Sequence, residues 1–172
     1  MSRTKTAQLI CFDDHRIITE DMIKRFSDLS KYKVESSHNR QDFISTLEKL
    51  ADSKSCKVAL IVLTDSQEQI AETAKMTYEI SKINQDTGII LIVPSGKMEE
   101  VRKSIKYNID AYIIKNPNAI LRIHNEVKKL VSEYNINIYR KRRNLSLSIL
   151  AVSIFITLLA VVVAYFRLPM YF

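Results

Sequence analysis

Glycine and proline are scarce in this chain, and their scarcity excludes several kinds of nucleotide site. Of the 172 residues, two are glycine, three are proline, two are cysteine and none is tryptophan. A G-x-G-x-x-G loop or a phosphate-binding P-loop needs glycines at spacings that the sequence does not contain. We therefore expect neither motif here.

The two cysteines, Cys11 and Cys56, lie in or beside short apolar runs, without the spacing of a metal-binding motif. No pair of histidines accompanies them. We interpret them as small core residues of a protein in a reducing compartment, not as a disulfide or a zinc site.

Positive charge exceeds negative charge by seven, and much of the excess lies in the basic cluster at residues 140–143. Residues 145–166, which follow, contain neither charge nor proline. As a helix they would rise about 1.5 Å per residue, enough to cross a hydrocarbon core of about 30 Å. A buried core helix is the alternative, but a small domain rarely hides so long an uncharged helix. We predict a transmembrane helix, with the basic cluster on its cytoplasmic side.

This pattern predicts four regions along the chain. Residues 1–138 form a cytoplasmic domain, 139–144 a basic juxtamembrane stalk, 145–166 the transmembrane helix and 167–172 a short extracytoplasmic tail. Because the stalk and the residues before it lack glycine and proline, we expect a stiff connection.

Short apolar runs alternate with helical patterns through the first 134 residues. Strands are predicted at 9–12, 33–37, 58–63, 89–93 and 112–114, and helices at 16–29, 40–50, 69–83, 98–107 and 118–134. Five strands alternating with five helices through short loops indicate an α/β fold, a five-stranded parallel, doubly wound sandwich.

Polar residues follow four of these strands. Asp13 and Asp14 end the first strand, Asp65 follows the third, Ser95 the fourth and Lys115 the fifth. Because the carboxyl ends of parallel strands meet at one edge of a sheet, we expect one pocket there. Its carboxylates suit Mg2+, which prefers oxygen ligands. The alternative for the acid pair is a helix N-terminus, where aspartate caps the first turn, and both interpretations stay open.

Residues 7–134 resemble a receiver domain (CheY-like) of two-component response regulators, which has the flavodoxin-like sandwich. Residues 11–18, C-F-D-D-H-R-I-I, are similar to the family's strand followed by a D-D-H or D-D-E turn. Residues 108–115, N-I-D-A-Y-I-I-K, resemble its G-A-x-D-Y-h-x-K segment. Asn108 stands where the family has glycine, and asparagine enters the left-handed region comparatively easily.

The resemblance implies a metal site and a phosphoacceptor. Asp13, Asp14 and Asp65 would bind Mg2+, directly or through water. Asp65 would take a phosphoryl group and form an acyl phosphate, in a reaction that depends on positioning and electrostatics.

The resemblance also implies three residues that respond to the phosphoryl group. Lys115 and Ser95 would contact its oxygens. Tyr112 would be the switch residue, moving inward when Ser95 moves.

The sequence also departs from the family pattern. Thr64 precedes Asp65, so a slip of one residue would put Thr64 at the acceptor position, although the spacing to Ser95 favours Asp65. Residues 66–69 contain no proline or glycine, and Lys115 is followed by an asparagine before the proline. These departures indicate a divergent receiver.

The histidines receive no catalytic role. His15 follows the acid pair, but Mg2+ prefers oxygen, so we interpret it as a loop residue. His38 and His124 have no acidic or cysteine neighbours at ligand spacing.

The leading hypothesis is a receiver anchored in the inner, cytoplasmic membrane of a bacterium. A histidine kinase or phosphotransfer protein would phosphorylate Asp65, and the domain would signal through protein contacts, including a membrane protein partner in the lipid bilayer. We expect no nucleic-acid partner, because no helix-turn-helix follows the receiver. We expect no enzymatic activity beyond self-phosphorylation and dephosphorylation. Apolar residues of the last predicted helix, interpreted as core, could instead form a homodimer seam: Ile120, Ile123, Val127 and Leu130.

Two other functions compete with it. A pseudo-receiver would be an unphosphorylated scaffold or adaptor subunit of a bacterial membrane complex, which the departures near Thr64 and Lys115 favour. A Mg2+-dependent phosphohydrolase is weaker, because no substrate-binding cap or general acid is visible.

Overall fold

The structure is a computed structural model that describes residues 7–13, 17–27, 31–64, 66–105 and 108–167. The chain divides into two compact units, the N-terminal unit Met1–Ser132 and the C-terminal unit Glu133–Phe172. Each is described by itself below.

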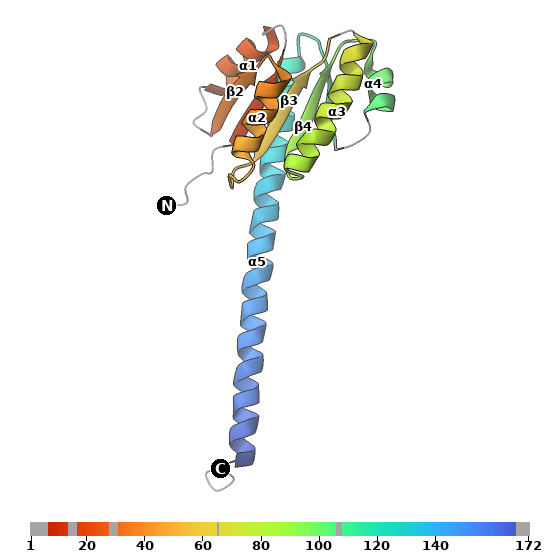
Figure 1. Cartoon of the computed structure of the whole chain (residues 1–172). Coiled ribbons are helices and arrows are strands. Elements are labelled where there is room, and N and C mark those ends of the chain that lie inside the picture. Colours follow the sequence, from red (N-terminus) through yellow and green to blue (C-terminus); the bar gives the residue numbers. More distant parts are fainter. Residues whose placement is uncertain (1–6, 14–16, 28–30, 65, 106–107, 168–172) are drawn as a thin grey trace. The chain divides into compact units, whose positions relative to one another are not determined.

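The N-terminal unit, whose ribbon is drawn in Figure 1, contains a five-stranded parallel sheet in the order β2-β1-β3-β4-β5. In chain order the elements are β1 (Ala7–Phe12), α1 (Ile17–Ser27), β2 (Tyr32–Ser37), α2 (Arg40–Leu50), β3 (Lys57–Val62), α3 (Gln67–Ile83), β4 (Gly88–Val93), α4 (Met98–Ser104), β5 (Ala111–Ile114) and α5 (Ala119–Arg167). The predicted parallel, doubly wound sandwich is confirmed.

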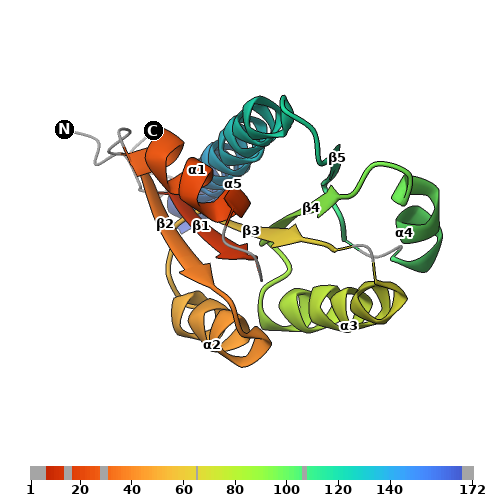
Figure 2. The ribbon, with the colours of Figure 1, turned by 90° about the horizontal axis from the view of Figure 1, so that it is seen from above.

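Helices cover both faces of the sheet. Viewed from above, α1 and the start of α5 lie on one face, and α2 and α3 lie on the other (Figure 2). Helices α2 and α3 bury the side chains that recur at helical spacing, including Phe43 and Leu47 in α2 and Met76 and Ile80 in α3. These residues pack against alternate residues of the sheet, such as Ile10, Ile61 and Leu91.

Strand β3 is buried along its whole length. After Lys57 its sequence is apolar throughout, as expected for a strand covered on both faces. Strand β2 lies at the sheet edge, and its residues are exposed or half-buried except Ser37, which is buried. The contrast between the two strands follows from their positions in the sheet.

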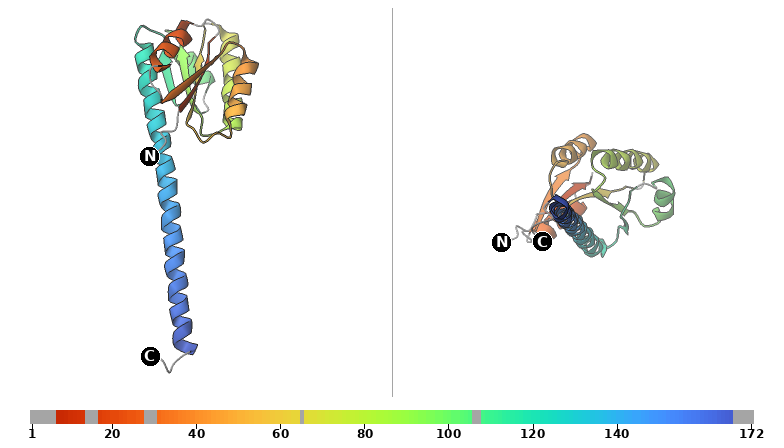
Figure 3. Two further views of the ribbon diagram at one scale, coloured as in Figure 1. Left: turned by 90° about the vertical axis from the view of Figure 1, so that its left-hand side faces the viewer. Right: turned by 90° about the horizontal axis from the view of Figure 1, so that it is seen from below.

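The first turns of α5 pack beside α1 (Figure 3). The Arg25 Nε donates to His124 Nδ1 at 3.4 Å, and the Phe26 ring lies 5.3 Å from the His124 ring. Ile123 and Val127 are fully buried, which confirms their interpretation as core residues. A Cβ added to Gly88 would lie 2.9 Å from Leu130 Cδ1, so glycine permits this close approach.

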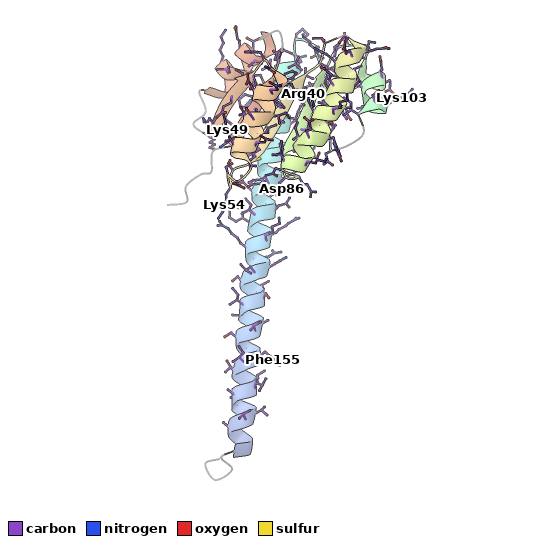
Figure 4. All side chains as sticks on the ribbon, viewed as in Figure 1. Arg40, Lys49, Lys54, Asp86, Lys103 and Phe155 are labelled. Atoms are coloured by element: carbon purple, nitrogen blue, oxygen red, sulfur yellow. The ribbon has the colours of Figure 1, made fainter. Side chains whose placement is uncertain are left out.

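The described part of the C-terminal unit, residues 133–167, belongs to helix α5 and is helical throughout the predicted stalk and span. The described residues contain one candidate membrane span, within this helix, whose most apolar 18 residues have a mean hydropathy of 2.9 and are not buried. Phe155 is 65% exposed, and its side chain extends away from the helix axis (Figure 4). By length and composition this helix can cross a membrane.

Candidate functional site

The carboxyl ends of four strands meet at one edge of the sheet. Phe12 at the end of β1 is opposite Ile61 in β3, and Val93 at the end of β4 is opposite Ile114 in β5. Backbone hydrogen bonds continue one residue beyond two strands: Leu63 N donates to Ile92 O at 2.9 Å, and Lys115 N donates to Val93 O at 2.7 Å. The described candidates Asp13, Thr64, Ser95 and Lys115 therefore follow strands that end side by side.

Asp13 directly follows β1 and is only 3% exposed. Its Oδ2 accepts hydrogen bonds from Ile18 N at 3.2 Å, Thr19 N at 3.2 Å and the Thr19 hydroxyl at 3.1 Å. These donors belong to the first turn of α1, whose amides lack partners within the helix. Asp13 thus performs the helix-capping role that the sequence offered as the alternative to metal binding. Asp14 and Asp65, predicted together with Asp13 as metal ligands, lie outside the described residues, as does His15.

Thr64, the competing acceptor, is tied to the start of α3. Its amide donates to Gln69 Oε1 at 2.9 Å, and its hydroxyl donates to the same oxygen. The backbone N–H of Gln69 in turn donates to the Ser66 hydroxyl oxygen at 3.3 Å, so Ser66 is the N-cap of α3. These contacts give the Thr64 hydroxyl a structural role at the start of α3. They do not test the choice between Thr64 and Asp65, because Asp65 lies outside the described residues.

Ser95 and Lys115 are both exposed at this edge. Ser95 lies in a turn closed by Lys97 N donating to Pro94 O at 3.2 Å, where Gly96 has a φ of 98°. The backbone of Lys115 is held against β4 by its hydrogen bond to Val93 O, so the Lys115 side chain extends from a fixed position at this edge.

Tyr112 is attached to the end of α4. Its hydroxyl donates to Ile105 O at 2.7 Å, and the Arg102 guanidinium lies 5.5 Å from the ring centroid. Burial raises the pKa of Tyr112, and the positive charge of Arg102 opposes that shift. The residue implied as the switch therefore holds the C-terminal end of α4 against β5.

The segment before β5 contains the asparagine expected to replace a glycine. Asn108 has a φ of 55°, which confirms that it adopts the left-handed region. Its Nδ2 donates to the Ser81 hydroxyl at 2.9 Å, linking this turn to α3.

His38 was given no role from the sequence, yet it contacts the site. Its Nδ1 lies 2.8 Å from Asp13 O, and because a carbonyl only accepts, Nδ1 must carry the proton. The strand register explains this contact. Phe12 is opposite Ser37, so Asp13 and His38, which directly follow β1 and β2, also lie side by side.

A cavity of about 290 Å³ opens between α2 and α3 beside this edge. Phe12 and Met76 contribute its apolar wall, and His38, Arg40 and Glu72 contribute polar groups. Arg40, labelled on α2 in Figure 4, forms a 2.6 Å ion pair with Glu79 of α3 next to the cavity. Phe12 faces this side of the sheet, whereas the Asp13 carboxylate binds α1 on the other side.

The donor chemistry at the edge is compatible with Mg2+, which binds carboxylate oxygen and water. Asp13 brings a buried carboxylate, but its Oδ2 already accepts three hydrogen bonds. Among the described residues no group of three His, Cys, Asp or Glu side chains is placed to hold a metal. A magnesium site here therefore depends on Asp14 and Asp65.

No protein-family model matches the sequence, and no curated protein matches it. Solved structures match the fold. A response regulator receiver domain from Clostridium thermocellum is 15% identical, with a TM-score of 0.60 over 76% of this chain and 98% of that chain. A CheY-like receiver domain protein from Methanospirillum hungatei JF-1 is 17% identical, with a TM-score of 0.56 over 77% and 98%.

A pilus assembly-related protein from Burkholderia pseudomallei K96243 has a similar fold. It is 8% identical, with a TM-score of 0.55 over 77% of this chain and 94% of that chain. These comparisons establish that the N-terminal unit has a receiver fold.

Proposed function

We propose that this chain is a membrane-anchored receiver that accepts a phosphoryl group on Asp65 from a histidine kinase or phosphotransfer protein. It signals by protein contacts from the inner membrane of a bacterium, with the N-terminal unit in the cytoplasm. The observation that carries this proposal is the convergence of four strand ends, with Asp13 buried at the first and Lys115 held on β4 at the last.

The transfer requires little from the protein beyond positioning. A carboxylate oxygen of Asp65 attacks phosphorus, and the bond from phosphorus to the donor's imidazole nitrogen breaks. The nitrogen keeps the electron pair and takes up a proton. Mg2+ bound by Asp13, Asp14 and Asp65 would offset the negative charge of the phosphoryl oxygens.

One cationic and one polar side chain, Lys115 and Ser95, complete the proposed site. Lys115 pairs with one phosphoryl oxygen as a point charge, and the Ser95 hydroxyl donates to another. Both are exposed, so neither pays to leave a buried hydrogen-bonded position before it reaches the phosphate.

Tyr112 and Arg102 are the route from the site to a partner surface. When Ser95 moves, Tyr112 exchanges its hydrogen bond to Ile105 O for an inward position. This frees the end of α4 and changes the surface beside β5. A phosphate can drive such a change because its charge and its strong hydrogen-bond acceptors stabilise the state in which Tyr112 points inward over the state in which it binds Ile105 O.

A second function is favoured by a specific contact. Because Asp13 Oδ2 already serves α1, the chain could use the receiver fold as an unphosphorylated scaffold in a membrane complex. The similar fold of a pilus assembly-related protein is consistent with this alternative.

Fluorine NMR of the full chain in detergent micelles with beryllofluoride distinguishes the two functions. We expect bound beryllofluoride signals that require Mg2+ and disappear in Asp65→Ala. The control Asp86→Ala removes an exposed acid from the turn before β4 (Figure 4) and should leave the signals intact. Absence of Mg2+-dependent signals from the folded wild type supports the scaffold, and their persistence in Asp65→Ala contradicts the assignment of the acceptor.

A further inference from the structure

The basic cluster at residues 140–143 surrounds helix α5 on all sides. Arg140, Lys141, Arg142 and Arg143 occupy four consecutive helical positions, and all four are exposed. Successive residues of an α-helix are rotated by about 100°, so four in a row distribute their charges around the axis. A partner that binds one face of the helix would contact only part of this cluster.

No acidic residue neutralises these charges locally. The last acid in the sequence is Glu133, and residues 134–172 contain no aspartate or glutamate. The ion pairs of the described residues involve none of the four cations. Arg140 and Arg143 are three residues apart, where like charges destabilise a helix. An external anion would relieve this repulsion.

The position of the cluster points to the chemistry of that anion. It directly precedes the uncharged stretch, where Leu145 and Leu147 are 64% and 57% exposed. Tyr139, on the other side, is 65% exposed, and tyrosine favours the boundary between lipid and water. If the apolar stretch lies in the hydrocarbon, the cluster lies at the level of the headgroups, which surround a helix on all sides.

We infer that residues 140–143 form a binding site for the phosphate groups of anionic phospholipids, which selects these lipids over zwitterionic ones. Three of the four cations are arginines, whose planar guanidinium can donate two hydrogen bonds to one phosphate. The inference rests on the membrane anchoring of the proposed function. Clusters of at least four basic residues beside a membrane helix attract anionic lipid electrostatically.

The test uses the full chain in nanodiscs made of phosphatidylcholine with a minority of phosphatidylglycerol. After mild delipidation, mass spectrometry measures which lipids remain bound to the protein. We expect phosphatidylglycerol to be enriched about fivefold over its share of the bilayer, and the enrichment to fall as salt increases. It should disappear when the four residues are replaced together: Arg140→Gln, Lys141→Gln, Arg142→Gln and Arg143→Gln.

A matched control removes the same charge from the N-terminal unit. It replaces four exposed lysines, of which the first, second and fourth are labelled in Figure 4: Lys49→Gln, Lys54→Gln, Lys75→Gln and Lys103→Gln. This variant should keep the enrichment of the wild type. A wild type without enrichment, or equal enrichment in the variant of residues 140–143, overturns the inference.

Alkaline carbonate extraction of membranes containing the chain separates this outcome from failure of the anchor. Release of the wild type by carbonate contradicts the proposed membrane attachment and the inference with it. Retention without enrichment of phosphatidylglycerol contradicts the inference alone. Binding of a nucleic acid that requires the cluster, with no lipid enrichment, would assign the cluster to another partner and also overturn it.

Discussion

Asp13 and Thr19 are joined by two hydrogen bonds across the junction between β1 and α1. Asp13 Oδ2 accepts from the Thr19 amide at 3.2 Å and from the Thr19 hydroxyl at 3.1 Å. The acid that should help to bind Mg2+ therefore also sets where α1 starts. One side chain thus links the proposed metal site to the stability of a helix.

Replacement of Asp13 should separate these two roles. Asp13→Ala removes the cap and should lower the free energy of unfolding by about 1–2 kcal/mol, whereas Asp13→Asn keeps an acceptor oxygen and should lower it less. Both should weaken Mg2+ binding, because both remove the negative charge. Thermal unfolding of the full chain in detergent and Mg2+ titration measure the two effects, with Asp21→Ala, an exposed acid on α1, as the control. Equal stability of the two Asp13 variants would contradict the capping role.

The buried ammonium of Lys57 should be important for stability. Lys57 is 4% exposed, and its Nζ donates to Ala51 O at 3.1 Å and Ser53 O at 2.8 Å, just after α2. Desolvation lowers the pKa of Lys57. Without the ammonium both carbonyls lose a donor, and Ala51 O keeps only the longer hydrogen bond from Asn84 Nδ2 at 3.3 Å. Lys57→Met should therefore cost about 1–3 kcal/mol of unfolding free energy. The exposed Lys54 (Figure 4) provides the comparison: Lys54→Met should change stability little.

Tyr112→Phe should release the end of α4. Loss of the hydrogen bond to Ile105 O should lower the unfolding free energy by about 1 kcal/mol near neutral pH. Burial raises the pKa of Tyr112 above 10.0 in the folded state, so this stabilisation is complete below pH 10 and is lost as pH rises through the folded-state pKa. The stability difference between wild type and Tyr112→Phe should thus shrink at alkaline pH. A difference that grows between about pH 9 and about pH 11 would be inconsistent with this contact.

The Thr64 hydroxyl should contribute to structure and not to phosphotransfer. Thr64→Val removes its hydrogen bond to Gln69 and should destabilise the chain by about 1 kcal/mol. The extent of phosphorylation by a small phosphodonor, read from the intact mass, should match that of the wild type. If the variant folds but takes up no phosphoryl group, the acceptor would have to be reassigned from Asp65 to Thr64.

The fold was predictable because its signals are local. An apolar run such as β3 and the helical spacing of Phe43 and Leu47 each specify an element and its buried face. The alternation of strands and helices then leaves few ways to arrange them. The edge where the candidate residues gather followed from the parallel sheet alone.

The individual contacts of the site were not predictable in the same way. The sequence left Asp13 equally suited to a metal and to a helix cap, because both roles need a carboxylate after a strand. The sequence gives no signal for the role of Lys57, since the carbonyls that it reaches depend on the path of the chain after α2. His38 and Gln69 were missed because their partners, Asp13 O and Thr64, are set by loop geometry.

The central claim is that Asp65 accepts a phosphoryl group at the edge where β1, β3, β4 and β5 end. Intact mass spectrometry of the full chain, incubated with Mg2+ and a small phosphodonor, tests it most directly. The account predicts the addition of one phosphoryl group that hydroxylamine removes, as expected of an acyl phosphate, and that Asp65→Ala abolishes. Failure of the folded wild type to gain mass, or an equal gain in Asp65→Ala, would contradict it.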